Sequence, residues 1–237
     1  MRVLVVGSCG KKKSYDSPKQ PTCKDIDEEH DLNYWKQQFS SHCVQARDMY
    51  TGPQSRELVK AVDLLRTIPD ISVQLVIISA GFGILNEEDL VPPYDCSFTT
   101  MRMPELRRQA EKLQIQDSIK NLLKNRFDLI YLALGKRYLL ALGRDVVSTL
   151  ETPTIVFHNQ STDYLIQIPC EAETVKSFSK REYKIHGVVG FKGDLLRILA
   201  QYALGRPNPR NEVRKWTDTA YLRELIYSLG GLGKLTQ

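Results

Sequence analysis

The sequence predicts a three-layer α/β/α sandwich with a mostly parallel central sheet, followed by C-terminal helices. Continuous β-branched and apolar runs lie at 2–6, 73–79, 129–134 and 154–157. Such runs indicate strands that are buried on both faces, as in parallel sheets. Stretches of helical character separate them at the spacing of strand–helix–strand units. With 42% hydrophobic and 26% charged residues, the 237-residue chain has an ordinary globular composition.

The strands are expected to alternate with helices along most of the chain. The first strand, 2–6, runs directly into Gly7. The helices are predicted over 31–48, 53–66, 104–124 and 136–150. Two of them begin with proline, whose missing N–H has no intrahelical acceptor at that position anyway.

The pattern is looser after residue 157. A short strand is expected at 164–168, then a charged connector, and then helices over 192–204 and 217–229 separated by the turn-rich sequence GRPNPRN. We divide the chain into an α/β core domain, 1–170, and a basic helical extension, 171–237. The extension either docks on the sheet or forms a small appendage, and we expect it to pack on the core.

The net charge of +5 is concentrated near the C-terminus. From Lys176 onward there are 12 lysines and arginines against 5 acidic residues, and the rest of the chain is near −2. This asymmetry favours nucleic acid, DNA or RNA, as the partner of the basic C-terminal region. The alternative is a solvated helical face without a partner.

Targeting signals and metal motifs are not evident. The N-terminal MRVLVV is too short for a signal peptide, and no apolar run approaches the roughly 18–20 residues of a membrane helix. The five cysteines are odd in number and lack a CxxC pair, which predicts reduced thiols. We therefore expect a cytoplasmic protein with no membrane partner, no metal and no cofactor. The oligomeric state does not follow from one chain.

The segment after the first strand, GSCGKKKSYDS, predicts an anion-binding loop. Glycines let backbone N–H groups approach an anion, and consecutive lysines supply positive charge. The spacing is not that of a Walker A loop, so nucleotide hydrolysis is not implied. Cys9 is either a nucleophile activated by the lysines or an inert buried thiol. The candidate binding residues here are Gly7, Ser8, Gly10, Lys11, Lys12, Lys13 and Tyr15.

Two further segments follow predicted strands. The long stretch 79–95 offers Ser79, Gly81, Tyr94 and Asp95, with the tyrosine able to stack on a base and the aspartate able to move protons. Alternatively, its prolines only rigidify the loop, and the tyrosine only packs over the hydrophobic core. Gly135 opens a helix whose free N–H groups would attract an anion, although tight strand-to-helix packing explains it equally well.

His158 follows the fourth strand, at the sheet edge where the other segments end. An electrophilic or acid role is expected for it, against the commoner structural role of a lone histidine.

Four separate segments resemble a bacterial and phage domain family with the pattern C-G-x-K-K, A-x-D-L-Y-x-G, S-A-x-x-G-L-L and P-Y-D. In this chain they are SCGKKKSY, ARDMYTG, ISAGFGIL and VPPYD, within about the first hundred residues. The stretch 78–95 is also similar to the peroxide-stress protein family, which implies DNA binding and iron homeostasis.

Two enzyme families show more distant similarity. The spacing of Cys9, Lys13 and Tyr15 resembles the C-x3-K-P-Y motif of archaeosine synthase, a tRNA-modifying enzyme that acts on a 7-deazaguanine base. Ser14 replaces the proline, and Gln20 stands where that motif has a histidine. The element order resembles uracil-DNA glycosylases, with FHNQST at the place of their His-Pro-Ser loop but no carboxylate before Tyr15 to activate water. Simple uracil excision is therefore not expected.

These observations predict a nucleic-acid- or nucleobase-directed enzyme that performs base modification or glycosidic-bond chemistry. Cys9, Asp95 and His158 are the expected catalytic residues, and the lysines would neutralise phosphate. One alternative is a non-catalytic DNA-binding stress-response protein. Another is an enzyme that acts on a small phosphorylated metabolite.

Overall fold

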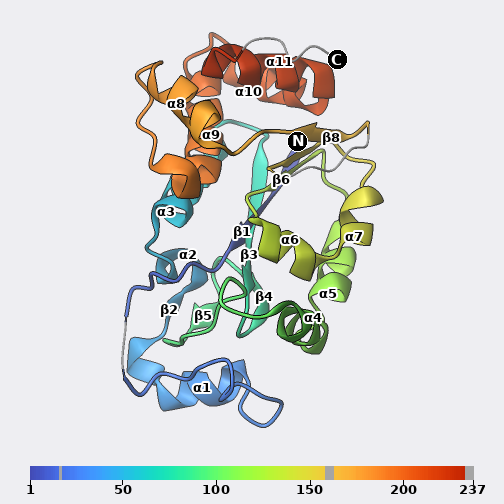
Figure 1. Ribbon diagram of the computed structural model, residues 1–237. Helices are drawn as coiled ribbons and strands as arrows, with labels where there is room; N and C mark the ends of the chain where they lie inside the picture. Colours follow the sequence, from blue (N-terminus) through green and yellow to red (C-terminus); the bar gives the residue numbers. More distant parts are fainter. Residues whose placement is uncertain (16–17, 158–162, 233–237) are drawn as a thin grey trace.

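The computed structural model describes residues 1–15, 18–157 and 163–232. Among these residues a six-stranded sheet forms the centre of the molecule, in the order β4-β3-β1-β6-β7-β8 (Figure 1). All neighbouring strands are parallel except β4, which is antiparallel to β3. The α/β class and the mostly parallel sheet are confirmed. The strands are β1 (Arg2–Ser8), β3 (Ser72–Ser79), β4 (Gly83–Asn86), β6 (Leu129–Leu132), β7 (Thr154–Val156) and β8 (Leu165–Gln167).

Helices cover both faces of the sheet, so that the sheet separates two apolar cores. One face carries α4 (Met103–Lys112), α5 (Ile115–Leu123), α6 (Lys136–Leu142) and α7 (Arg144–Ser148). The other carries α3 (Pro53–Arg66), α8 (Ala172–Ser179), α9 (Gly187–Leu204), α10 (Pro209–Arg214) and α11 (Thr219–Gly230).

Helix α3 has the predicted bounds. Pro53 occupies its first turn, and its buried apolar positions Leu58, Ala61, Val62 and Leu65 follow the helical repeat. This stripe packs on the sheet, and the adjacent face of α3 packs on α9.

The predicted helix over 31–48 is wrong. The structure has α1 (Leu32–Gln38), the 3₁₀ turn η1 (Ser40–His42), the strand β2 (Val44–Gln45) and the short α2 (Ala46–Met49) in its place. Strand β2 forms because it pairs with β5 (Leu90–Val91), a partner more than forty residues away. The stretch 79–95 is correspondingly not a plain loop, since it contains both β4 and β5.

Two predicted helices are each split in two. Gln114, with φ 48°, separates α4 from α5, and Gly143, with φ 92°, separates α6 from α7. The left-handed backbone ends a right-handed helix at each point. At Gly143 an added methyl group would lie 2.6 Å from Gln116 Nε2, so the two breaks pack against one another.

The C-terminal residues pack on the same core as α3 and the sheet. Helix α9 begins earlier than predicted, at Gly187, and α8 and α10 lie in regions expected as connector and turn. Helices α10 and α11 lie at the amino ends of the strands (Figure 1). Arg210 of α10 pairs with Asp70 at 2.8 Å, and Arg223 of α11 donates to Leu165 O at 3.5 Å. Among the described residues, no helix combines the length and apolar character needed to cross a bilayer.

Helix α9 approaches α3 closely through Gly193. A methyl group there would lie 2.3 Å from the backbone oxygen of Gln54, which cannot rotate away. We expect Gly193→Ala to lower the free energy of unfolding by about 2–3 kcal/mol, as overpacking does. Urea unfolding measures this. In the matched control, Gly205→Ala, the nearest atoms lie at 3.6 Å, so the change should stay within about 1 kcal/mol. Equal effects of the two variants would contradict this account of the α3–α9 contact.

Candidate functional site

The segment after β1 lies against the segment 49–51. The N–H of Cys9 continues the sheet by donating to Ile78 O at 2.9 Å. Beyond it, Thr51 N–H donates to Lys12 O at 3.0 Å and Ser14 N–H donates to Met49 O at 2.8 Å. These bonds hold the lysine-containing loop against the ARDMYTG segment.

Cys9 lies in a buried polar environment at the carboxyl ends of the strands. Its side chain is 3% exposed, and Sγ lies 2.9 Å from Tyr138 Oη, which donates to Cys9 O at 2.8 Å. Ser97 Oγ is 3.3 Å from the same hydroxyl. Ala80 N–H points at the sulfur from 3.5 Å.

Two further tyrosines lie next to this group and are connected to it through Ser79, the residue before Ala80. Tyr94 Oη lies 2.8 Å from both Tyr50 Oη and Ser79 Oγ, and both tyrosines are buried. We call the whole group the thiol–hydroxyl cluster. Its members are Cys9, Tyr50, Ser79, Tyr94, Ser97 and Tyr138.

Lysine 13 covers the cluster. Its Nζ lies 4.4 Å from the centre of the Tyr94 ring and donates to Gly10 O at 3.3 Å. Lys11 and Lys12, by contrast, are exposed. The structure therefore brings the cysteine–lysine segment and the tyrosine segment together, with one lysine in contact and two facing solvent. Tyr94 is fully buried, so stacking on a base would require Lys13 to move aside.

The ends of β1 and β6 meet the first turn of α3. Gln54 Nε2 donates to Ala133 O at 2.9 Å and to Ser8 Oγ at 3.4 Å. Gly135 follows as the residue before α6, and a methyl group built on it would meet nothing within 4 Å. At Gly7 and Gly10 an added methyl group would make ordinary contacts, so neither packing nor backbone strain demands glycine there.

The other predicted site residues lie around the cluster. Asp95 is exposed, and its N–H donates to Pro21 O at 2.8 Å. Tyr15 is 37% exposed and its ring lies 4.4 Å from that of His42. Gly81 packs against the Tyr94 ring, where a methyl group would be only 3.1 Å away. His158 lies outside the described residues.

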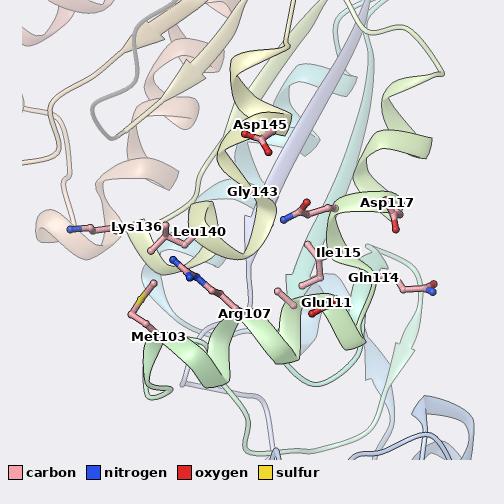
Figure 2. A pocket seen from close by; sticks show the side chains of 12 residues that line it. Met103, Arg107, Glu111, Gln114, Ile115, Asp117, Lys136, Leu140, Gly143 and Asp145 are labelled. Atoms are coloured by element: carbon pink, nitrogen blue, oxygen red, sulfur yellow. The ribbon is translucent and has the colours of Figure 1, made fainter.

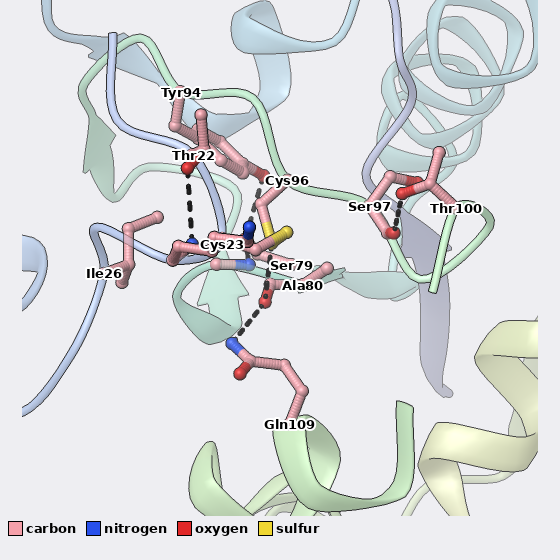
Figure 3. The surroundings of a disulfide bond; sticks show 12 residues. Thr22, Cys23, Ile26, Ser79, Ala80, Tyr94, Cys96, Ser97, Thr100 and Gln109 are labelled. Carbon is pink, nitrogen blue, oxygen red and sulfur yellow. Dashed lines mark hydrogen bonds between the residues drawn. A yellow bond between two sulfur atoms is a disulfide. The ribbon is translucent and has the colours of Figure 1, made fainter. Parts of the chain in front are cut away.

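A disulfide joins Cys23 to Cys96, so the expectation that all cysteines are reduced is wrong (Figure 3). The two residues are 73 apart in sequence, with Cα atoms 4.8 Å apart. They meet because Thr22 pairs with Asp95 along the backbone. Spacing along the chain does not reveal this contact. The disulfide borders the cluster, since Cys96 O lies 3.9 Å from Cys9 Sγ.

One group of side chains has the spacing of metal ligands: Glu57, His186 and Asp194 offer atoms within 4.8 Å of one another. Arg197 already occupies this place, with Nε 2.6 Å from Glu57 Oε2. Burial would raise the pKa of Glu57, but the hydrogen bond and charge of Lys60 and the charge of Arg197 lower it below the usual range. A guanidinium among the carboxylates leaves little attraction for a metal ion.

A cleft of about 830 Å³ lies between α4, α5 and the helix pair α6–α7 (Figure 2). Its lining mixes Arg107 and Lys136 with Glu111, Asp117 and Asp145. Of the predicted site residues that the structure describes, none lines this cleft, which lies beside α6, the helix that carries Tyr138. It carries no single charge character that indicates a ligand.

The sequence analysis did not assign roles to several residues of the site. Tyr50 lies in the segment ARDMYTG and Tyr138 in the first turn of the helix that Gly135 opens, and their place in these segments was the available signal. The sequence contains no comparable signal for Ser97 and Gln54, because their hydrogen-bond partners are known only from the tertiary structure.

Comparisons with known proteins assign the chain to no family. It matches no protein-family model and no curated protein.

Burial raises the pKa of Tyr50, Tyr94, Tyr131 and Tyr138 above the ordinary value, and for all but Tyr131 the nearby charge of Cys9 adds to it. Each folded-state pKa exceeds the unfolded value of about 10, so the unfolded state binds fewer protons above that pH. Stability from these residues is complete below pH ~10 and is lost as the pH rises beyond it. Each tyrosine should contribute a slope of about 1.4 kcal/mol per pH unit.

Urea unfolding between neutral and strongly alkaline pH measures this slope. Tyr138→Phe should reduce the slope of the unfolding free energy against pH by the contribution of one tyrosine, ~1.4 kcal/mol per pH unit. Tyr164→Phe is the control, because Tyr164 is 44% exposed, and should leave the slope unchanged. A slope that is identical in all three proteins would rule out the burial of Tyr138 as its cause.

The disulfide should stabilise the fold by restricting the unfolded chain. For a loop of this length we expect reduction to cost about 2–4 kcal/mol. Urea unfolding with and without a dithiol reductant tests this. A Cys23→Ser, Cys96→Ser double variant should match the reduced protein and be insensitive to reductant. Coincident curves for oxidised and reduced wild type would show that the bond does not contribute.

Proposed function

We propose that this protein is an enzyme that acts on a nucleobase or nucleoside, either free or within nucleic acid. The observation that carries the proposal is the meeting of the cysteine–lysine loop, the ARDMYTG segment and the Tyr94 segment in one thiol–hydroxyl cluster. Together with Tyr138 of α6, these segments, which are distant in sequence, supply unlike reactive groups to one edge of the sheet. Ligands of open parallel sheets bind at this edge.

Phosphate would be held by Lys11 and Lys12, which are exposed on the loop. The loop lies beside the start of α3, since Thr51 bonds to Lys12 and Gly52 precedes the helix. The first N–H groups of a helix have no intrahelical acceptors and attract anions. Backbone donors and two ammonium groups together suit a phosphate.

The buried hydroxyl groups would act as donors. Because burial raises the pKa of Tyr94 and Tyr138, both stay protonated at neutral pH. Preorganised neutral donors stabilise negative charge that develops on a nearby atom, such as a thiolate or a substrate oxygen. Cys9 would attack the substrate or position it, with its sulfur beside Tyr138 Oη.

Proton transfer is assigned to Asp95 or His158. Asp95 adjoins Cys96, whose carbonyl lies near the Cys9 sulfur, and its carboxylate is exposed to incoming substrate. His158 stays a candidate on its position after the fourth strand.

The basic C-terminal region would contribute less to nucleic-acid binding than its net charge alone indicates. Of its cations, Arg197, Arg210 and Lys215 are in ion pairs. Helices α10 and α11 lie at the amino ends of the strands, whereas Lys11 and Lys12 follow the carboxyl end of β1. A polymer that contacts the loop would therefore bind mainly at the carboxyl edge.

Incubation with bulk tRNA and DNA, followed by mass spectrometry of released bases and altered nucleosides, tests the proposal. We expect a changed base or nucleoside with the wild type and a loss of several orders of magnitude in product with Cys9→Ser. Cys43→Ser is the matched control and should retain activity, since Cys43 lies beside α1. Unchanged nucleosides from every substrate pool would contradict the proposal.

A non-catalytic nucleic-acid-binding protein is the second candidate, favoured by the burial of Cys9 and the exposure of Lys11 and Lys12. Salt-dependent binding of oligonucleotides separates it from an enzyme on a small metabolite, which would show no binding. Substituting both lysines with alanine should reduce the slope of log affinity against log salt by about 2. Binding without product would then favour the second candidate.

A further inference from the structure

His186 and Asp194 form a hydrogen-bonded pair at the start of α9. Nδ1 of the histidine lies 2.8 Å from Asp194 Oδ1, and the histidine backbone N–H donates to Oδ2 at 2.7 Å. Asp194 is fully buried, whereas the His186 side chain is 26% exposed. Both carboxylate oxygens therefore serve to hold the same residue.

This contact fixes the imidazole. An ionised carboxylate at Nδ1 favours the tautomer that carries its proton there, which leaves the Nε2 lone pair as an acceptor. Within the part of the chain that the structure describes, Nε2 has no hydrogen-bond partner. His186 is therefore arranged as a general base whose ring is oriented by the Asp194 carboxylate.

Charged groups on α9 and α3 surround the pair. On α9, Arg197 Nη2 lies 3.7 Å from Asp194 Oδ1. On α3, Glu57 binds Arg197 and Lys60, so its charge is compensated. An imidazolium at His186 would thus face one buried carboxylate directly and one compensated carboxylate nearby.

The pair borders the candidate site across the first turn of α3. A methyl group built on Gly190 would meet His186 Cβ at 2.5 Å and Pro53 Cβ at 3.4 Å, so both residues pack around this glycine. The following residue, Gln54, bonds to Ser8 and Ala133 at the ends of β1 and β6. The exposed Val188 and Val189 lie on the same first turn of α9.

We propose that His186 and Asp194 form an acid–base dyad that serves this site from the α3 side, an inference that rests on the proposed function. Nε2 takes a proton from an attacking water, whose oxygen bonds to the sugar carbon as the glycosidic carbon–nitrogen bond of the bound nucleoside breaks. Asp194 stabilises the resulting imidazolium. The proton then passes from Nε2 to the base nitrogen that leaves, which restores the neutral histidine, and water is the co-reactant consumed.

The variant His186→Asn separates this role from a structural one. Its amide N–H can replace Nδ1–H toward Asp194, so the fold is retained, but nothing replaces Nε2. We expect product formation to fall by about 10²-fold or more with unchanged affinity for oligonucleotides. His30→Asn is the control, because His30 also bonds to an aspartate, Asp27, on the exposed N-terminal segment. Normal turnover in His186→Asn would overturn the dyad.

A second measurement does not depend on turnover. Diethyl pyrocarbonate acylates the unprotonated nitrogen of histidine, and peptide mass spectrometry locates the product. Exposure alone ranks His30, at 39%, above His186, at 26%. The dyad instead predicts faster labelling of His186, and slower labelling of His186 in Asp194→Asn. Slower labelling of His186 than of His30 would overturn the proposal. Fast labelling without any nucleoside product would leave the dyad standing and count against the proposed function.

Discussion

The position of β1 between two parallel neighbours is the constraint on which the rest of the structure depends. Val3 to Val6 are buried, and the strand pairs with β3 on one side and β6 on the other. A shift of register by one residue would turn every apolar side chain to the wrong face. The pairing therefore determines where the chain leaves the sheet, and it delivers Cys9 to Ala80 on one side and Tyr138 on the other.

The cluster links chemistry to stability, because its hydroxyl groups are buried and must be partnered. A buried polar group without a partner costs about 1–3 kcal/mol, whereas a satisfied network is nearly neutral. Tyr94 partners both Tyr50 and Ser79. Its loss would remove a side-chain partner of the Tyr50 hydroxyl, whereas Ser79 Oγ would still accept from the N–H groups of Gly81 and Phe82. The same groups that would perform a reaction also hold the loops in place.

Local sequence patterns predicted the parts of the structure that local forces decide. The apolar strands and α3 (Pro53–Arg66), with proline at its start and a clear apolar stripe, need only short-range information. Strand β2 and the Cys23–Cys96 disulfide depend on residues brought from elsewhere in the chain. The contact of His186 with Asp194 is local, but it depends on α9 beginning at Gly187, and the sequence predicted the start of this helix at residue 192. The predicted segments of the site do meet, but the sequence does not show which side chains point inward. Asp95, which we predicted as a catalytic residue, is exposed, whereas Tyr138, to which we gave no role, contacts the thiol.

Lysine 13 resting on the Tyr94 ring has a consequence for how a ligand would enter. The ammonium group is attracted to the ring face by a cation–π contact, worth about 0.5–2 kcal/mol. A phosphate competes for the same ammonium with a stronger, charge-assisted bond. Arrival of the anion would then draw the Lys13 side chain away from the Tyr94 ring, while the contacts of that ring with Phe82 and Gly81 would stay in place.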